Sequence, residues 1–226
     1  MFQRWSRSSC SKIMLKILIT FIFFPVLLFA AQGKAPFPKL LREVDEKYKK
    51  SRTLEADFTQ ENIILALKRR EKSSGRIAFK RPDKVRWHTL KPDESLLVSN
   101  GSKFWYYTPP FSEDDKGQVT EGKASGLNSR FANALLSGSF STGNVQKLEK
   151  TGKSTFLVMP KQRTAGTVSK AWIDIDPVKK IITKVIMEHN DGNRTEILLT
   201  NIKLGVGLED GMFNFTMPPN TEVVVK

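Results

Sequence analysis

Residues 79–101 read FKRPDKVRWHTLKPDESLLVSNG, and residues 104–111 read FWYYTPPF. Within them, VRWH and SLLV have the short, apolar-containing character of strands. The dipeptide Asn100-Gly101 follows the second of these strands and is a strong signal for a tight hairpin turn. The aromatic run FWYY supplies the return strand, which a pair of prolines ends. This stretch therefore predicts successive antiparallel hairpins.

The same kind of pattern continues on both sides of this stretch. Further strands are predicted at residues 54–60, 75–80, 155–159, 171–176, 181–189, 194–203 and 222–225. Helices are predicted at 37–50 and 128–138, because apolar residues recur there at three- and four-residue spacing. Residues 113–126 are polar and glycine-bearing, which is typical of a mobile loop.

These elements predict a mainly β protein with a large antiparallel sheet and two helices. Sheets of this size usually curl. A closed eight-strand barrel fills its own interior or holds one small ligand. A bent open sheet with two helices across its mouth would instead leave a groove, and an apolar groove would suit a lipid.

Residues 1–33 are typical of a cleaved secretory signal peptide. An apolar run at 17–30 is preceded by basic residues and no acid: Arg4, Arg7, Lys12 and Lys16. The run has fourteen residues, fewer than the roughly twenty that a bilayer span needs. A small-x-small pattern predicts cleavage before Lys34, so one domain is expected over 34–226. An uncleaved anchor and a start at Met14 stay open.

Composition narrows the possible chemistry. The chain has 226 residues, with 37 Lys or Arg and 23 Asp or Glu. Cleavage would remove four bases and no acid, which lowers the net charge from +14 to +10. The single cysteine, Cys10, precedes the apolar run, so neither a disulfide, a thiolate cluster nor lipidation is expected. With only His88 and His189, a multi-histidine zinc site is excluded. Export argues against nucleic acid and favours anionic membranes or acidic proteins as partners.

The order of short motifs along the chain is more specific than any single strand. Lys-Arg-Pro at 80–82 precedes a strand that ends in Trp-His, Pro-Asp-Glu-Ser follows at 92–95, and a strand leads into Val-Ser-Asn-Gly at 98–101. ADFTQ at 56–60 and FNFTMPP at 213–219 lie outside that segment. Together these motifs resemble the outer-membrane lipoprotein carriers of the LolA family over nearly the whole predicted mature chain.

The resemblance implies a monomeric, non-enzymatic carrier in the periplasm of a Gram-negative bacterium. Its fold would be a strongly curved antiparallel sheet, an incomplete β-barrel, with helices covering an apolar cavity. Its partners would be triacylated lipoproteins, an inner-membrane lipoprotein-releasing ABC transporter and, where one exists, an outer-membrane acceptor lipoprotein. It implies no cofactor, no metal and no nucleic acid.

Arg81 matches the family arginine that hydrogen-bonds to the helical lid and holds the empty cavity closed. A guanidinium suits this role, because it offers five donors in a rigid fork. The alternative is a solvated charge beside Lys80 and Lys84. Pro82 biases Arg81 towards an extended conformation, and the pair is expected to control the lid and the cavity. The alternative for Pro82 is that it only marks the edge of a strand.

The cavity candidates are apolar residues of the predicted strands and the central helix: Phe58, Phe79, Val85, Trp87, Leu97, Phe104, Tyr106, Phe131 and Leu135. Val85 and Trp87 share the strand face that the family turns towards its cavity, and the family often has phenylalanine where this chain has Val85. For Phe58, Leu97 and Phe131, core packing is an equally good interpretation.

The strand at 104–107 poses a separate question. Phe104 and Tyr106 share one face, and Trp105 and Tyr107 share the other. Both faces are aromatic, so the pattern leaves open which one lies inside.

Three other functions stay open. The same fold can carry a glycolipid or act as a sensor of mislocalised lipoproteins. A secreted hydrolase would need His88 or His189 as its base, although neither lies in a nucleophile motif. A single-strand nucleic-acid binder would stack bases on the aromatic strand at 104–107.

Overall fold

The computed structural model describes residues 38–126, 130–138 and 145–225. All of them belong to one unit of the chain, Pro36–Lys226. The expected signal peptide lies outside the described residues. Among the described helices, none has both the length and the hydropathy needed to cross a bilayer.

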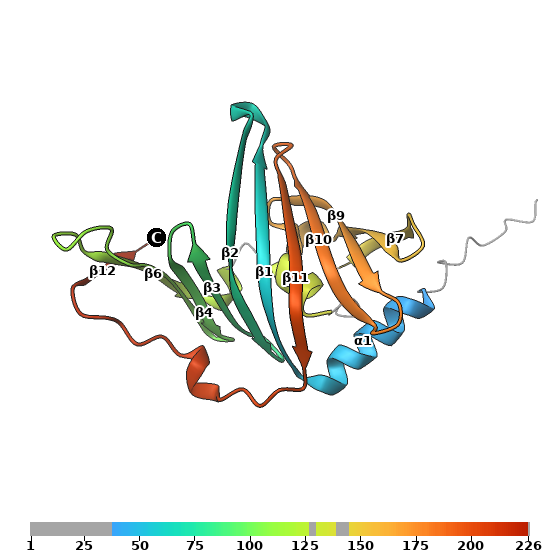
Figure 1. Ribbon diagram of the computed structural model, residues 1–226, viewed down its shortest axis with the longest axis horizontal. Coiled ribbons are helices and arrows are strands. Elements are labelled where there is room, and N and C mark those ends of the chain that lie inside the picture. Colours follow the sequence, from blue (N-terminus) through green and yellow to red (C-terminus); the bar gives the residue numbers. More distant parts are fainter. Residues whose placement is uncertain (1–37, 127–129, 139–144, 226) are drawn as a thin grey trace, which may run out of the picture. The chain divides into compact units, whose positions relative to one another are not determined.

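In the described part of the chain, twelve strands form one sheet (Figure 1). They are β1 (Thr53–Ile64), β2 (Arg69–Lys80), β3 (Lys84–Lys91), β4 (Ser95–Asn100), β5 (Lys103–Thr108), β6 (Gly117–Lys123), β7 (Val145–Lys150), β8 (Thr155–Pro160), β9 (Val168–Asp176), β10 (Ile181–His189), β11 (Arg194–Leu204) and β12 (Thr221–Val225). The helices are α1 (Lys39–Ser51), α2 (Arg130–Leu136) and α3 (Gln162–Ala165), with 3₁₀ turns η1 (Leu65–Leu67), η2 (Ala124–Gly126) and η3 (Asp210–Phe213).

The strand order places the first strand in the middle of the sheet. It runs β12-β6-β5-β4-β3-β2-β1-β11-β10-β9-β8-β7. Neighbouring strands are antiparallel except β12, which lies parallel to β6. The chain therefore passes from one side of the sheet to the far edge between β6 and β7, and α2 lies in that connection.

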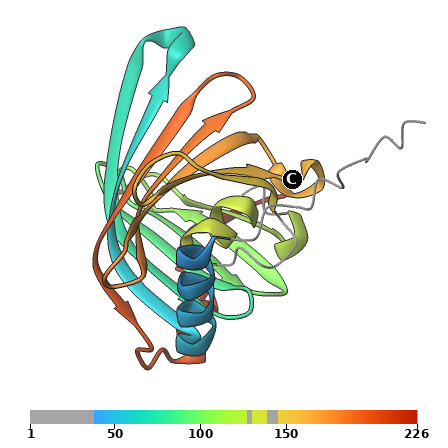
Figure 2. The same cartoon turned by 90° about the vertical axis from the view of Figure 1, so that its right-hand side faces the viewer.

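The sheet is strongly curved, and α1 and α2 lie on its concave side (Figure 2). β-Bulges contribute to the bend, because an extra residue on one strand increases the local twist. One bulge sets Glu55 to Asp57 of β1 against a longer stretch of β11, where Asn201 has a φ of 50° and donates a 2.7 Å hydrogen bond to Asp57. The expected fold class, an unclosed, curved antiparallel sheet with helices, is confirmed.

Helix α1 follows the predicted apolar stripe. Leu41, Val44 and Tyr48 are buried against the sheet, and Arg52 ends the helix in the left-handed conformation with its N–H bonded to the Tyr48 carbonyl. The same face also buries Asp45, which is 5% exposed. The stripe fixes α1 on the concave face.

The interpretation of 113–126 as a mobile loop is wrong for half of its length. Residues of β6 pair with β5 on one side and β12 on the other. Val119, which pairs with Tyr107, is completely buried. A single apolar residue in a polar run gives little strand signal by itself, and pairing with neighbouring strands decided the structure. Strand β7 and helix α3 were also not predicted.

After β11 the chain crosses the convex face before it returns as β12 (Figure 1). We call residues 205–220 the C-terminal strap. Phe213 in the strap is completely buried, and Phe215 lies against the rings of Trp105 and Tyr107, with centroids 6.4 and 5.5 Å away. The strap therefore covers one face of the aromatic strand.

Candidate functional site

Cross-strand register shows which side chains share the concave face, because directly opposed residues of antiparallel strands point the same way. Phe79 of β2 is opposite Val85 of β3. Trp87, two residues further along β3, is opposite Leu97 of β4, and Leu97 is opposite Tyr106 of β5. Five of the predicted cavity residues therefore lie on one face.

Phe58 and Phe104 lie on this face too. The Phe58 ring is 4.6 Å from the Trp87 ring, centroid to centroid. Ser99 is opposite both Val85 and Phe104, which places Phe104 on the concave side. The open question about 104–107 is thereby resolved: Phe104 and Tyr106 face the helices, and their neighbours face the strap.

Burial along this face falls from β1 towards β5. Three side chains are buried in the core, with 2, 5 and 2% exposure: Phe58, Phe79 and Val85. Three more are partly buried: Trp87, Leu97 and Phe104. Tyr106 at the end of the series is 46% exposed. The apolar face therefore extends from a packed centre to an accessible margin.

Close backbone approach is needed where Phe58 meets β2. Phe58 is opposite Gly75, and a Cβ at Gly75 would lie 1.9 Å from the backbone oxygen of His88. The glycine is therefore required by the spacing between β2 and β3, and it leaves room for the Phe58–Trp87 contact.

Helix α2 covers the centre of the concave face. Leu135, which was predicted, is 1% exposed, and Leu136, which was not, is completely buried. Both belong to the same apolar core as the concave strand residues. The side chain of Phe131 lies outside the described part of the structure. The missed core residues come mainly from the second half of the sheet: Phe156, Val158, Ile173, Val185, Ile197 and Leu199.

Arg81 reaches the end of α2. Its Nη2 donates a 2.8 Å hydrogen bond to the main-chain oxygen of Ser137, directly after the helix. Its own N–H bonds the carbonyl of Arg52, at the end of α1, over 2.9 Å. The Arg81–Pro82 peptide bond is cis, and Pro82 is exposed. Arg81 therefore contacts both helices that cover the concave face, while Pro82 makes the turn into β3.

The Arg81 guanidinium lies in a partly buried, charged environment. Burial lowers its pKa below the usual value, and the negative charge of Asp45 opposes that shift. The Asp45 carboxylate is itself buried: Oδ2 is 2.7 Å from Lys49 Nζ, while Oδ1 has no hydrogen-bond partner among the residues that the structure describes. The sequence did not predict a role for Asp45, because an acidic residue in a lysine-rich helix is normally expected on the solvent-exposed face.

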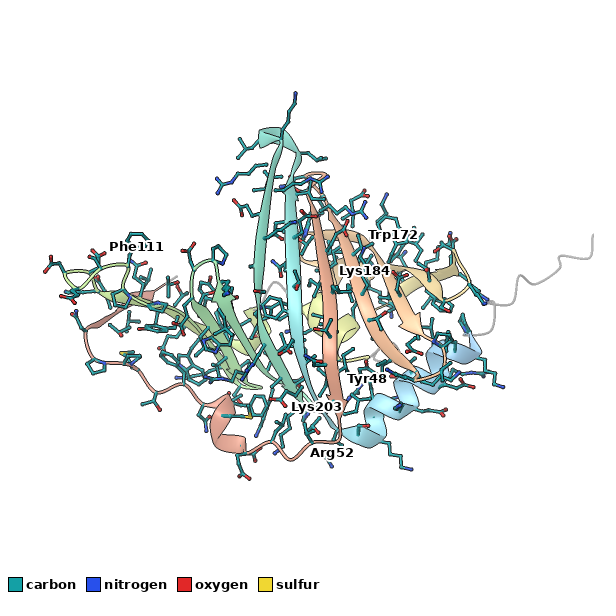
Figure 3. All side chains as sticks on the ribbon, in the orientation of Figure 1. Tyr48, Arg52, Phe111, Trp172, Lys184 and Lys203 are labelled. Atoms are coloured by element: carbon teal, nitrogen blue, oxygen red, sulfur yellow. The ribbon has the colours of Figure 1, made fainter. Side chains whose placement is uncertain are left out.

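Tyr48 and Gly138 seat the two helices against each other. The Tyr48 hydroxyl accepts a 3.0 Å hydrogen bond from the Ile182 N–H, at a bulge of β10, and burial raises the Tyr48 pKa to about 12. Figure 3 labels Tyr48 where α1 meets the sheet. Gly138 has a φ of 65°, and a Cβ there would lie 2.6 Å from the Tyr48 ring. The end of α2 therefore rests directly on α1.

A hollow of about 840 Å³ lies on the other side of the sheet around β1, β2, β10 and β11. Its lining is mostly polar and charged, and includes Glu55, Asp57, Arg76, Lys179 and Lys203. Acyl chains gain nothing from such a surface.

The two histidines make local contacts: His88 with Glu94 at 2.7 Å, and His189 with the hydroxyls of Thr167 and Thr195.

The protein is thus a curved, open antiparallel sheet whose apolar concave face is covered by helices, and Arg81 joins those helices to the sheet. The family model "Outer membrane lipoprotein carrier protein LolA" matches residues 49–216, and the chain belongs to this family. The match contains Arg81 and β1 to β11, and it leaves most of α1 and all of β12 outside.

Named relatives agree with this assignment, and a solved structure is similar in fold. The chain is 30% identical over 177 residues to the outer-membrane lipoprotein carrier protein of Pseudomonas aeruginosa strain PAO1, covering 77% of this chain and 82% of that protein. It is 28% identical over 212 residues to the protein of the same name from Azotobacter vinelandii, covering 89% and 98%. A crystal structure of an uncharacterized conserved protein from Thermus thermophilus is similar in fold, with a TM-score of 0.50 at 12% identity over 82% of this chain and 98% of that one.

Proposed function

We propose that this protein carries lipoproteins across the periplasm of a Gram-negative bacterium and holds their acyl chains against the concave face of the sheet. Family membership and the names of the relatives support this function. The observation that carries it for this chain is the Arg81 hydrogen bond to Ser137, which holds a short apolar helix over an apolar sheet face.

The energetics require a carrier with such a face. Moving one acyl methylene from an apolar environment into water costs about 0.8 kcal/mol. A chain of roughly sixteen carbons would therefore cost on the order of 10 kcal/mol, and a triacylated lipoprotein has three chains. Helix α2 covers the same kind of surface, so its return when cargo leaves offsets part of the lost burial.

In this proposal, the Arg81 side chain holds α2 in the closed position. In the closed state its guanidinium bonds Ser137 O, and displacement of α2 by acyl chains breaks that bond. The Asp45 Oδ1, which has no partner among the described residues, is then a nearby acceptor for the Arg81 guanidinium. Phe58, Phe79, Val85, Trp87, Leu97, Phe104, Tyr106, Phe131 and Leu135 are the proposed acyl contacts.

The remaining parts of the proposal concern processing and partners. Residues 1–33 direct export and are removed, which leaves one carrier domain, 34–226. An inner-membrane ABC transporter supplies the work of release at the start, and an outer-membrane acceptor with higher affinity drives delivery. The protein has no enzymatic activity, and ester hydrolysis that depended on His88 or His189 would contradict this.

The test compares two arginines. Arg86 also donates a hydrogen bond to a main-chain oxygen, that of Met212 at 3.1 Å, but on the convex face. The protein is incubated with spheroplasts, and the lipoprotein in the soluble fraction is then transferred to outer-membrane vesicles. We expect Arg81→Leu to stay folded and transfer several-fold less cargo, and Arg86→Leu to transfer as the wild type does. Normal transfer by a folded Arg81→Leu protein would contradict the proposal that Arg81 holds α2 in the closed position.

Cargo identity needs a separate measurement. The protein is purified from its own periplasm without detergent, after mild crosslinking, and analysed by mass spectrometry. Triacylated lipoproteins are the expected cargo. Recovery of a free glycolipid alone would keep the fold and change the substrate, and the absence of lipid together with no binding of an apolar dye would overturn the proposal.

A further inference from the structure

The hairpin between β1 and β2 projects beyond its neighbours (Figure 1). Its two strands pair from Thr53↔Lys80 to Ile64↔Arg69. On the β3 side, pairing stops at Ser74, which is opposite Lys91. We call residues 64–70 the hairpin tip. One flank of the hairpin near the tip therefore has no neighbouring strand.

Two leucines at the hairpin tip are exposed to solvent. Leu65 is 57% exposed and Leu67 is 67% exposed, and both lie in the turn η1. Large exposed side chains of this kind normally mark a contact surface when they cluster. They lie at the end of a projection, where a protein pocket of matching shape would be needed to bury both.

The turn that presents the leucines is fixed by hydrogen bonds. The Leu65 N–H donates to Asn193 Oδ1, 3.0 Å away, in the neighbouring β10–β11 turn. Lys68 ends η1 with a φ of 48°, and its N–H bonds the Leu65 carbonyl over 3.1 Å. The leucines are therefore held in place before any partner arrives, which lowers the entropy cost of binding.

Basic side chains surround the leucines. Between Glu61 and Lys72 there are four cations and two acids: Lys68, Arg69, Arg70 and Lys72 against Glu61 and Glu71. The Arg69 and Arg70 side chains are 64 and 65% exposed, although they pair with Glu71 and Glu61. The tip therefore combines exposed apolar side chains with an excess of positive charge.

We propose that the hairpin tip is a contact site for an anionic lipid bilayer. Leu65 and Leu67 enter the boundary between headgroups and acyl chains, and Lys68, Arg69 and Arg70 meet lipid phosphates. Exposed leucines surrounded by basic side chains favour contact with the membrane interface. A soft bilayer accepts a convex apolar tip without a preformed pocket. An acidic protein would satisfy the charges but leave the leucines unexplained.

The experiment measures co-sedimentation with vesicles and needs no lipoprotein cargo. The protein, purified as processed by the cell, is mixed with vesicles of phosphatidylethanolamine and phosphatidylglycerol (3:1) or of phosphatidylcholine alone. We expect binding to the anionic vesicles that weakens as salt rises. Leu65→Ser with Leu67→Ser should lower the apparent affinity by about tenfold.

Two further variants make the result specific. Leu198→Ser removes a leucine of similar exposure, 46%, from the outer face of β11, and should bind within about twofold of the wild type. Lys68→Glu with Arg69→Glu should abolish the preference for anionic vesicles. Circular dichroism checks that each variant is folded.

Three outcomes would overturn the proposal. They are no binding of the wild type to anionic vesicles, wild-type affinity of the double-serine variant, and equal loss of affinity in Leu198→Ser. Dependence on the charges but not on the leucines would mean attraction to the headgroup phosphates without insertion, which also contradicts the proposal. The result is independent of the carrier function, because the vesicles hold no lipoprotein and the cargo assay is read separately on Arg81→Leu.

Discussion

Arg81 and Arg86 lie close together in the sequence, and each donates a hydrogen bond to a main-chain oxygen on a different face of the sheet. Burial lowers the pKa of both guanidinium groups. The structures they hold are different. Arg81 holds the end of an apolar helix on the concave face, and Arg86 holds the C-terminal strap on the convex face.

The strap is tied to the sheet by charges and aromatic rings. Asp210 lies 2.8 Å from Lys80 Nζ and 2.9 Å from Lys84 Nζ, and Phe215 stacks on the aromatic strand. Helix α2 covers the concave face with leucines. An acyl chain can replace leucine contacts but cannot replace ion pairs. If the proposed function is right, acyl chains displace α2 from the concave face, whereas the strap stays in place on the convex face.

The largest expected effect comes from removing the buried Phe213 ring of the strap. We expect Phe213→Ala to lower the free energy of unfolding by about 3–5 kcal/mol, because the side chain has no exposure. Phe111→Ala is the control, since Phe111 is 94% exposed (Figure 3), and should change stability by less than about 0.5 kcal/mol. Urea unfolding measures both. Equal effects would mean that the strap is a loose cover.

The next test acts where α2 meets α1. Gly138→Ala places a Cβ against the Tyr48 ring at a left-handed φ, which should cost about 1–3 kcal/mol. It should also increase the fluorescence of an apolar dye, because α2 no longer seats on the concave face. Gly211→Ala is the control, since its Cβ meets no atom within 4 Å. Unchanged dye binding in Gly138→Ala would mean that α2 closes without this contact.

A smaller effect separates the two arginines in the absence of cargo. Arg81→Leu and Arg86→Leu should each cost about 1 kcal/mol of stability, the net value of one hydrogen bond. Only Arg81→Leu should raise dye binding, since only its bond holds a helix over the concave face. If Arg86→Leu raised dye binding equally, the two faces would be coupled through β3.

The smallest effect is a pH dependence of the strap. Hydrogen bonds from Lys80 and Lys84 lower the pKa of Asp210 from 3.8 to about 2. Because the folded pKa lies below the unfolded one, the stabilisation is present above about pH 4 and is lost as the pH falls to about 2. The difference in Tm between wild type and Asp210→Asn should therefore shrink over this range. A difference that stays constant from pH 6 to 2 would exclude this ion pair as its source.

Much of the concave face was predictable, because strand alternation places residues of one parity together. Val85 and Trp87 were assigned to one face from their spacing alone, and the structure agrees. The hairpin at Asn100-Gly101 was equally clear, and Gly101 has a positive φ of 91° in the turn between β4 and β5.

The orientation of the aromatic strand was not predictable from its own residues. Both of its faces are apolar, since the strap covers Trp105 and Tyr107 with a phenylalanine from more than a hundred positions later. The register with Leu97 decides the question, and register is a property of the assembled sheet. The particular partner of Arg81 was not predictable for a different reason, because Ser137 O is a main-chain atom that no side-chain pattern marks.

The central position of β1 has a consequence for how the chain folds. Strands β1 to β6 and β7 to β11 each form by successive hairpins, which close quickly. Within the sheet, the strand pair that links the two halves is β1 with β11, and there Asn201 bonds a residue 144 positions away, Asp57. Such a distant closure is slow. A chain that emerges from its N-terminus first must therefore keep one edge of its earliest strand unpaired until nearly the last strand has been delivered.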